Sequence, residues 1–203
     1  MSMAIQVHSK RAEKTRRLII NNASRIFVER GFRNVSVEEL CKVVGVSKVT
    51  FYKYFENREA LVETLVDECL SEALPAMTEN FESDKDVEQI IETHYNLLVD
   101  LFMSRISARM MADMESQMPR TWERLEEVRK AETKALIRLF NRGQREGTIR
   151  QDIDPAVARV IFEEIMGSIF RPGFLISKGL TLKQAGSTVK AVFLHGIVEK
   201  NGK

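Results

Sequence analysis

The side chains best suited to chemistry in this chain are basic and hydroxyl groups crowded between Ser47 and Arg58. Lys48 can donate hydrogen bonds to guanine acceptors in the DNA major groove, and Lys53 can pair with phosphate. Val49 can offer only an apolar contact, for instance to a thymine methyl group. Groups that read bases and groups that bind phosphate thus lie within one short stretch, which predicts contact with DNA.

Two short helices joined by a turn must position these side chains. Ser36 followed three residues later by Glu39 predicts a capping box that starts the first helix. Gly45 can adopt the left-handed conformation that ends this helix, and Ser47 can cap the second one. A helix this short needs packing partners, and its other face supplies three aromatic side chains, Phe51, Tyr54 and Phe55. The pattern predicts a helix-turn-helix, whose second helix enters the DNA major groove.

Residues of this motif, together with one arginine of the preceding helix, are predicted to contact DNA. Thr50 lies beside Lys48, which favours DNA contact over a merely solvated position. Tyr52 can pack in the core, but the inward positions are already filled, so its hydroxyl is expected at phosphate. The basic cluster around Arg16 is either a solvated face or a set of phosphate or minor-groove contacts. The predicted set is Arg16, Ser36, Ser47, Lys48, Val49, Thr50, Tyr52, Lys53 and Arg58.

At these residues the chain resembles the tetracycline-repressor (TetR) family of bacterial transcription regulators. The likeness lies in Gly31-Phe32, in VEELCKVVGVSKVTFYKYF, and in the NREAL that begins at Asn57, roughly the first quarter to third of the chain. Val49 stands where the family usually has Gly, so base preference cannot be copied from relatives. Arg58 stands where Lys is frequent and keeps the charge for a phosphate contact. The resemblance implies a helical homodimer whose body holds an inducer.

The distribution of charge agrees with one end of the molecule meeting phosphate. Residues 1–60 hold 12 Lys and Arg against 6 Asp and Glu, whereas the remainder holds 19 against 23. No apolar run is long enough to span a membrane, and the N-terminus lacks a signal-peptide pattern. The sequence therefore predicts an intracellular, soluble, cytoplasmic protein without a membrane partner.

The pattern of apolar residues predicts an all-α fold of about nine helices with short connections. Residues 1–56 are expected to form the helix-turn-helix domain, and residues 57–203 the ligand-binding and dimerisation domain. The first thirteen residues are expected to be a frayed basic arm. Pro75 lies within the long helix that begins after Asn57, so we expect a kink or an early end there.

The methionine-rich stretch at 103–118 is either flexible core filling or part of a binding site. The resemblance favours a site, because family members hold an inducer in the helical body. Residues 104–118 are then expected to pack between the long helix and the cavity. His94 is either the polar group that orients the ligand or, the favoured interpretation, a satisfied core histidine. An apolar lining suits a lipophilic ligand, and the predicted lining is Phe81, His94, Tyr95, Leu98, Phe102, Met110, Met111, Met114, Trp122, Ile165, Met166 and Ile169.

The last two long helices are expected to form a two-fold, four-helix dimer interface. The helix that begins after Asp154 is apolar on nearly every side and must be buried on every side. The alternative is a deeply buried hairpin in a monomer. Glu163 and Glu164 either meet a cationic ligand or, as we favour, pair with arginines across the dimer. The predicted interface residues are Arg159, Phe162, Glu163, Phe170, Val189, Phe193 and Gly196.

Two other classes of protein are alternatives to a regulator. An all-α enzyme needs convergent titratable or metal-binding groups, but the three His and two Cys show no ligand spacing, and no phosphate loop or nucleophile motif is present. The sequence therefore predicts no catalytic residue, no metal and no cofactor. A DNA-binding protein with the same head but a filled body, architectural or linked to division, is the second alternative. We expect a homodimeric repressor released from a palindromic operator on double-stranded DNA by a small lipophilic ligand.

Overall fold

The computed structural model describes residues 2–169 and 171–198, leaving the side chains of 2–9, 101, 102, 155, 159, 166 and 172 undescribed. This part of the chain forms ten α-helices and one π-helical segment, η1. The elements are α1 (Ser2–Arg30), α2 (Val37–Val44), α3 (Lys48–Tyr52), α4 (Arg58–Phe81), α5 (Val87–Leu97), η1 (Leu98–Met103), α6 (Ala108–Gln117), α7 (Pro119–Glu146), α8 (Pro155–Ile169), α9 (Pro172–Ser177) and α10 (Leu182–Ile197).

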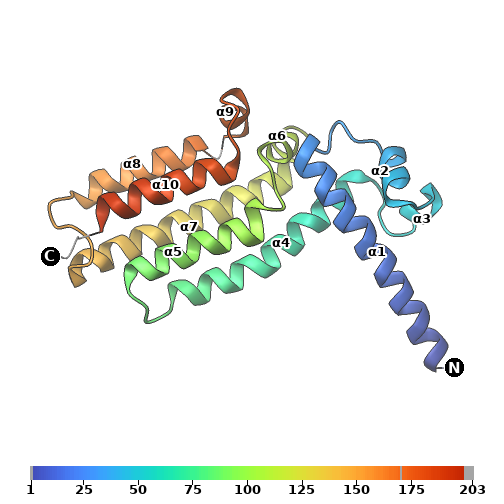
Figure 1. Cartoon of the computed structure of the whole chain (residues 1–203), viewed down its shortest axis with the longest axis horizontal. Coiled ribbons are helices and arrows are strands. Elements are labelled where there is room, and N and C mark those ends of the chain that lie inside the picture. The colour runs from blue at the N-terminus through green and yellow to red at the C-terminus, as the bar shows by residue number, and fades with distance from the viewer. Residues whose placement is uncertain (1, 170, 199–203) are drawn as a thin grey trace.

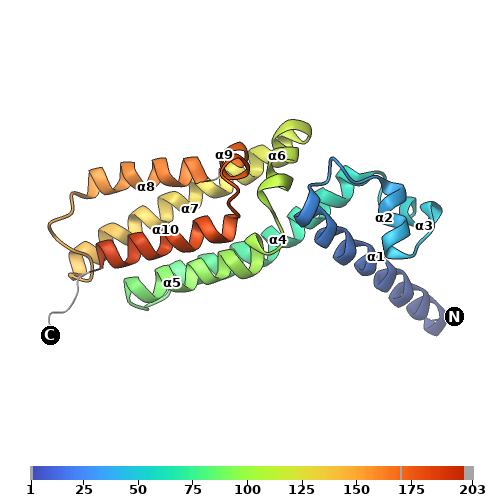
Figure 2. The same cartoon turned by 45° about the horizontal axis from the view of Figure 1, so that its top comes forward.

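The all-α prediction is confirmed. Helices α1 to α3 gather at one end of the molecule, and α5, α7, α8 and α10 form an elongated bundle at the other (Figure 1). Helix α4 runs from the first group along the bundle, and α6 lies beside the C-terminal end of α1 (Figure 2). The helix count slightly exceeds the nine or so expected, and the short helix α9 is one element that the sequence did not predict.

The helix-turn-helix forms for the local reasons that its sequence suggests. The Ser36 side chain accepts a hydrogen bond from the Glu39 amide at 3.1 Å, and the Ser47 side chain accepts one from the Thr50 amide at 3.0 Å. Gly45 ends α2 with φ of 75°, a conformation that glycine adopts without strain. The expected capping box forms only in half, since the Glu39 carboxylate pairs with Arg30 instead.

Helix α4 continues through Pro75 to Phe81, so the early end expected there does not occur. The exposed face of α4 carries Pro75, where the carbonyl that loses its helical partner can be solvated. The opposite face stays buried over several turns through Leu70, Ala73 and Met77. Packing along this buried face outweighs one missing hydrogen bond, because it removes apolar surface from water along the whole helix.

The N-terminal arm also differs from expectation, because α1 is helical from Ser2 rather than from the region of Glu13. The early part of α1 projects away from the other helices in both views (Figures 1 and 2). Its later part is anchored by a buried face that includes Ile19, Ala23 and Phe27, each completely buried. Helix continuity from this anchored part extends order into a segment whose composition alone suggests fraying.

One apolar core runs from the helix-turn-helix into the body. It contains Phe27 and Phe51 of the N-terminal group together with Met110 and Met114 of α6. Helix α6 packs mainly on α1, α7 and α9, instead of between α4 and the cavity as the sequence suggested. The methionines of α6 therefore join the body to the end of α1.

Candidate nucleic-acid interface and ligand cavity

Helix α3 presents its polar face to solvent while its aromatic face is buried. Val49 is 81% exposed and Tyr52 is 54% exposed, whereas Phe51 is buried among the core residues. Lys53 is exposed at the end of α3, and Thr50 is half-buried with its hydroxyl 2.9 Å from the Ser47 hydroxyl. The predicted contact residues of α3 thus share one accessible surface, in which a branched apolar side chain stands among donors.

Lys48 has a partner on α2 that the sequence pattern did not indicate. Its Nζ lies 2.6 Å from Oε2 of Glu38, and both side chains are largely exposed. This pairing lowers the pKa of Glu38 and raises that of Lys48. An ion pair in open solvent contributes little to stability, so Lys48 can exchange this carboxylate for another acceptor at small cost.

The two predicted arginine contacts lie in a different setting. The Arg58 guanidinium donates from Nη1 to the carbonyl oxygens of Arg33 at 3.0 Å and Val35 at 3.2 Å, and it lies 5.5 Å from the centroid of Phe32. Arg58 also pairs with Glu59 at 2.6 Å. Arg58 therefore fastens the start of α4 to the loop after α1, and its phosphate contact stays a prediction.

Arg16 is held in a similar way to Arg58. Its Nη1 lies 3.4 Å from a carboxylate oxygen of Glu68 on α4, and its guanidinium lies 5.8 Å from the centroid of Phe55. Ser36 and Ser47 are likewise occupied as helix caps. Among the predicted DNA-contact residues, those of α3 are the ones whose side chains are open to a partner molecule.

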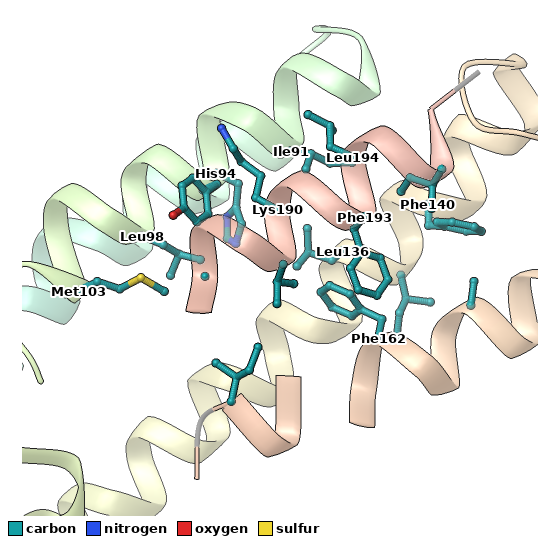
Figure 3. A pocket seen from close by; sticks show the side chains of 17 residues that line it. Ile91, His94, Leu98, Met103, Leu136, Phe140, Phe162, Lys190, Phe193 and Leu194 are labelled. Carbon is teal, nitrogen blue, oxygen red and sulfur yellow. The ribbon is translucent and has the colours of Figure 1, made fainter. Parts of the chain in front are cut away.

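A cavity of about 110 Å³ lies between α5, α7, α8 and α10 (Figure 3). Four residues predicted to bind a ligand line it: His94, Tyr95, Leu98 and Ile169. Three residues predicted for the dimer interface line it too: Phe162, Val189 and Phe193. The rings of Phe162 and Phe193 meet edge to face with centroids 5.1 Å apart. The predicted interface and the predicted ligand site therefore share one wall.

The cavity has further lining residues that are not among the predicted ligand contacts. Helix α7 supplies Leu136, Ile137 and Phe140, and α10 supplies Gly186, Lys190, Leu194 and Ile197. The remaining members are Ile91, Met103 and Ala158. The sequence pattern could not single them out, because apolar periodicity does not distinguish a cavity wall from a filled core.

The other predicted ligand residues lie away from this cavity. Met110 and Met114 are buried in the core shared with α1, and Ile165 packs against that core. Met111 and Trp122 line a smaller space of about 40 Å³ between α4 and α7. Phe81 stacks on His94 with ring centroids 4.6 Å apart. The predictions for the Phe102, Met166 and Arg159 side chains and for Phe170 fall outside the described residues.

His94 is the buried polar group of the cavity wall. It is 3% exposed, and neither ring nitrogen has a hydrogen-bond partner among the described residues. Burial lowers its pKa to about 4, so the ring is neutral at pH 7 and offers one donor and one acceptor. The favoured interpretation, a core histidine with satisfied hydrogen bonds, therefore has no protein partner to support it among the described residues.

The outer side of α8 and α10 carries exposed apolar side chains. On α8 these are Val157, Val160 and Ile161, of which Ile161 is 48% exposed. On α10 Val192 is 64% exposed, and Gly196 is exposed nearby in the sequence. Helix α8 lies at the edge of the bundle, with α10 next to it (Figure 1). Glu163 in α8 is half-buried. The exposed apolar surface consists of Val157, Val160 and Ile161 on α8 and Val192 on α10.

Helix α6 contacts the end of α1 through polar groups. The Asp113 carboxylate accepts a hydrogen bond from the Arg33 amide at 2.9 Å, and Arg109 donates to the Glu29 carbonyl at 3.4 Å. Gly31, with φ of 74°, leaves room for this approach, since a Cβ there would lie 2.5 Å from Asp113 Oδ2. The body therefore contacts the N-terminal helices through α6.

Within the described residues, no group of His, Cys, Asp and Glu side chains is placed to hold a metal ion. The same part of the chain contains no helix that is both long and apolar enough to cross a membrane.

Comparison with known proteins identifies the family. A family model described as "Bacterial regulatory proteins, tetR family" matches residues 19–65, which run from α1 into α4. The transcriptional repressor KstR2 of Mycobacterium tuberculosis (strain CDC 1551 / Oshkosh) is 27% identical over 212 residues, covering 98% of each chain. The chain belongs to the TetR family. The TetR-family regulator UidR of Escherichia coli (strain K12) is 28% identical over 147 residues, 72% of this chain and 74% of UidR.

The fold agrees with this membership. The structure of the ketosteroid transcriptional regulator KstR2 superposes with a TM-score of 0.66 at 20% identity, covering 91% of this chain and 95% of KstR2. As a member of the TetR family, this chain is a DNA-binding transcriptional regulator that forms dimers, and it is not an enzyme. The resemblance drawn from the helix-turn-helix residues is therefore confirmed.

Proposed function

We propose that this TetR-family regulator is a repressor that a small lipophilic ligand releases from a palindromic operator. The observation that carries the proposal is the apolar cavity between α5, α7, α8 and α10, with one unpartnered polar side chain in its wall. KstR2, which is similar over the whole chain, is described as a repressor, which supports the same sign of regulation here.

Residues 1–56 form the DNA-binding part of this proposal, with α3 in the major groove. Lys48 reads a base, Val49 makes an apolar base contact, and Lys53 binds phosphate. The exposure of Val49 and Tyr52 supports this assignment, because such apolar surface on a small, otherwise well-packed helix suits a partner. Glu38 gives up its ion pair with Lys48 when DNA binds.

Residues 57–203 form the ligand-binding and dimerisation part. We place the two-fold contact on the outer face of α8 and α10, centred on Val160, Ile161 and Val192. This choice replaces the expected central role of Phe162 and Phe193, whose rings line the cavity. A second copy of the chain would cover the exposed apolar residues and set the spacing of two α3 helices for a palindrome.

The route from ligand to DNA runs through η1 and α6. Leu98 and Met103, at the two ends of η1, line the cavity. After four further residues the chain enters α6, which contacts the end of α1 through Asp113. A ligand that displaces Met103 shifts α6 and, through it, the orientation of the DNA-binding helices.

The proposal is tested by binding experiments on the full chain. An operator is first selected from random DNA, and affinity for it and for random DNA is measured at several salt concentrations. Lys48→Ala is expected to lose preference at one base position, at a cost of about 1–3 kcal/mol, whereas Lys53→Ala weakens all sequences alike and lowers the salt slope by about one. Equal losses on operator and random DNA for Lys48→Ala would contradict base reading.

The dimer contact has its own matched test. Ile161→Glu places a charge in the proposed contact and is expected to give monomers and to weaken operator binding strongly. Ile176→Glu on α9, where the parent residue is similarly exposed at 45%, is the control and should remain dimeric. A folded dimer from Ile161→Glu in light scattering would place the contact elsewhere. If no compound that binds the cavity changes operator affinity, the alternative of a DNA-binding protein without an inducer would be favoured.

A further inference from the structure

His94 combines two properties that are costly to hold together in a folded protein. The side chain is buried at 3% exposure, and both ring nitrogens lack a hydrogen-bond partner within the described chain. An unsatisfied buried polar group destabilises the fold, because it has left water without a replacement bond. A leucine or phenylalanine at this position would avoid this loss of stability. A hydrogen bond between His94 and a bound ligand would offset it.

The surroundings of His94 are apolar on the sides that the structure describes. Its ring packs at a tilt on Phe81, and it forms part of a cavity wall that is otherwise almost entirely aliphatic and aromatic. Both ring nitrogens are covered by neighbouring atoms, so a ligand in the cavity reaches one of them by turning the imidazole. Two further polar side chains, those of Lys190 and Tyr95, line this cavity, and both already have interaction partners. Lys190 Nζ lies 3.4 Å from a Glu92 carboxylate oxygen and 4.9 Å from the centroid of the Tyr95 ring. The Tyr95 hydroxyl donates to the Lys183 carbonyl at 3.4 Å.

We infer that the cavity takes a small uncharged ring compound whose single hydroxyl or carbonyl group hydrogen-bonds to His94. The inference rests on the proposed function, in which this cavity is the ligand site. A neutral imidazole has one donor and one acceptor, which match a hydroxyl or a carbonyl. A carboxylate would have to draw Lys190 away from Glu92 to replace its lost hydration, and an ammonium ion would face an apolar wall, so desolvation disfavours both relative to a neutral ligand.

The size of the cavity limits the ligand to about one ring. At about 110 Å³ it is somewhat smaller than the roughly 150 Å³ cavity that is known to hold benzene. Gly186 contributes to this volume, since a Cβ there would lie 3.0 Å from Met103 Cε and 3.3 Å from Tyr95 Cε2. A six-membered ring with one substituent therefore fits with a small adjustment of Met103, whose thioether is flexible.

The test compares four probes of similar size on the full chain without DNA: toluene, phenol, benzoate and benzylammonium. Phenol is expected to bind roughly 3- to 10-fold more tightly than toluene, the gain of one hydrogen bond to an unsatisfied group. Benzoate and benzylammonium should bind no better than toluene. Affinities are measured by calorimetry and by thermal stabilisation at several concentrations.

Variants of His94 separate a ligand-binding role from a purely structural one. His94→Leu should raise the melting temperature of the free protein and abolish the preference for phenol over toluene. His94→Gln, which keeps a donor and an acceptor, should retain part of that preference. The chain has three histidines, so phenol should move one set of imidazole nitrogen resonances in labelled protein, and His94→Leu should remove that set.

Other outcomes overturn the inference. Asn80 also has an orphaned side-chain oxygen, Oδ1, and it donates to the Ile90 carbonyl, one turn before His94 in α5. If a buried water joins Asn80 to His94, the imidazole resonances will not respond to phenol and toluene will bind as tightly. Tighter binding of benzoate would assign the site to Lys190 instead. If phenol binds as expected but operator affinity does not change, the His94 site stands and the proposed inducer role fails.

Discussion

Arg58 is the residue for which a DNA-binding role and a structural role predict the most clearly different results. Its guanidinium donates to two carbonyl oxygens in the loop after α1, those of Arg33 and Val35, and stacks near Phe32. Its side chain is 21% exposed. Replacing Arg58 by alanine leaves these carbonyl groups without their donor and removes the stacking contact, so we expect a loss of stability.

The magnitude follows from these contacts. Hydrogen bonds to charged groups contribute about 1.5–3 kcal/mol each, and a partly exposed stacking contact adds about 0.5–1 kcal/mol. Water can replace part of each bond at this exposure, so Arg58→Ala should cost about 2–4 kcal/mol. In a chain of this length such a loss lowers the melting temperature by roughly 4–16 °C.

Two measurements on the same variants decide between the roles. Melting temperature and the salt dependence of DNA binding are measured for Arg58→Ala, Arg58→Lys and the control Lys53→Ala. Arg58→Ala should lose stability with an unchanged salt slope, while Lys53→Ala should keep its melting temperature and lose about one unit of slope. Lysine cannot reproduce the planar fork, so Arg58→Lys should not restore stability. An Arg58→Ala protein of normal stability with a reduced slope would refute the structural role.

Three further predictions concern the body. Asp113→Ala should reduce the effect of phenol on operator affinity by about 1 kcal/mol while leaving phenol binding unchanged. The control Glu115→Ala on the same helix should leave this effect unchanged. Titrations of operator DNA with and without phenol measure the effect for each variant. Burial raises the pKa of the Glu132 carboxyl in α7 to about 7. In the folded protein this group therefore keeps a proton that it loses near pH 4.5 in the unfolded chain. The free energy of unfolding should therefore fall as the pH rises from about 4.5 to about 7. Glu132→Gln should be about 2 kcal/mol more stable than the parent at pH 8 and equal to it at pH 4 by denaturant titration. Gly186→Ala should narrow the cavity against Met103 and weaken phenol binding without changing the dimer in light scattering.

The parts of the fold that the sequence predicts are those with local causes. The caps at Ser36 and Ser47 and the left-handed Gly45 depend on residues within a few positions of one another, and all three form as expected. The capping box at Thr181 and Gln184 forms for the same reason. Exposure along α3 is similarly local, because Phe51 takes the inward position of this short helix and leaves Val49 and Tyr52 exposed.

The features that the sequence misses depend on distant partners. The structural contacts of Arg58 cannot be seen in the sequence, because the loop carbonyls that accept its hydrogen bonds lie more than twenty residues away. Pro75 looks like a helix end because its solvent exposure is decided by the packing of α4. The inward orientation of Phe162 depends on the partner helix α10, which an apolar stripe alone cannot reveal.

The polar contact at α6 and the nearby cavity can supply part of the free energy that a switch needs. A tenfold to hundredfold change in operator occupancy requires about 1.4–2.8 kcal/mol of differential ligand affinity. The hydrogen bond from the Arg33 amide to the Asp113 carboxylate is exposed and contributes about 1 kcal/mol, so breaking it accounts for most of a tenfold change. Met103 lines the cavity only five residues before α6 begins, and α6 packs Met110 and Met114 into the core that it shares with α1. A ligand that displaces Met103 would therefore move α6 together with this end of α1, and the packing of these methionines would carry the rest of the change to the DNA-binding helices.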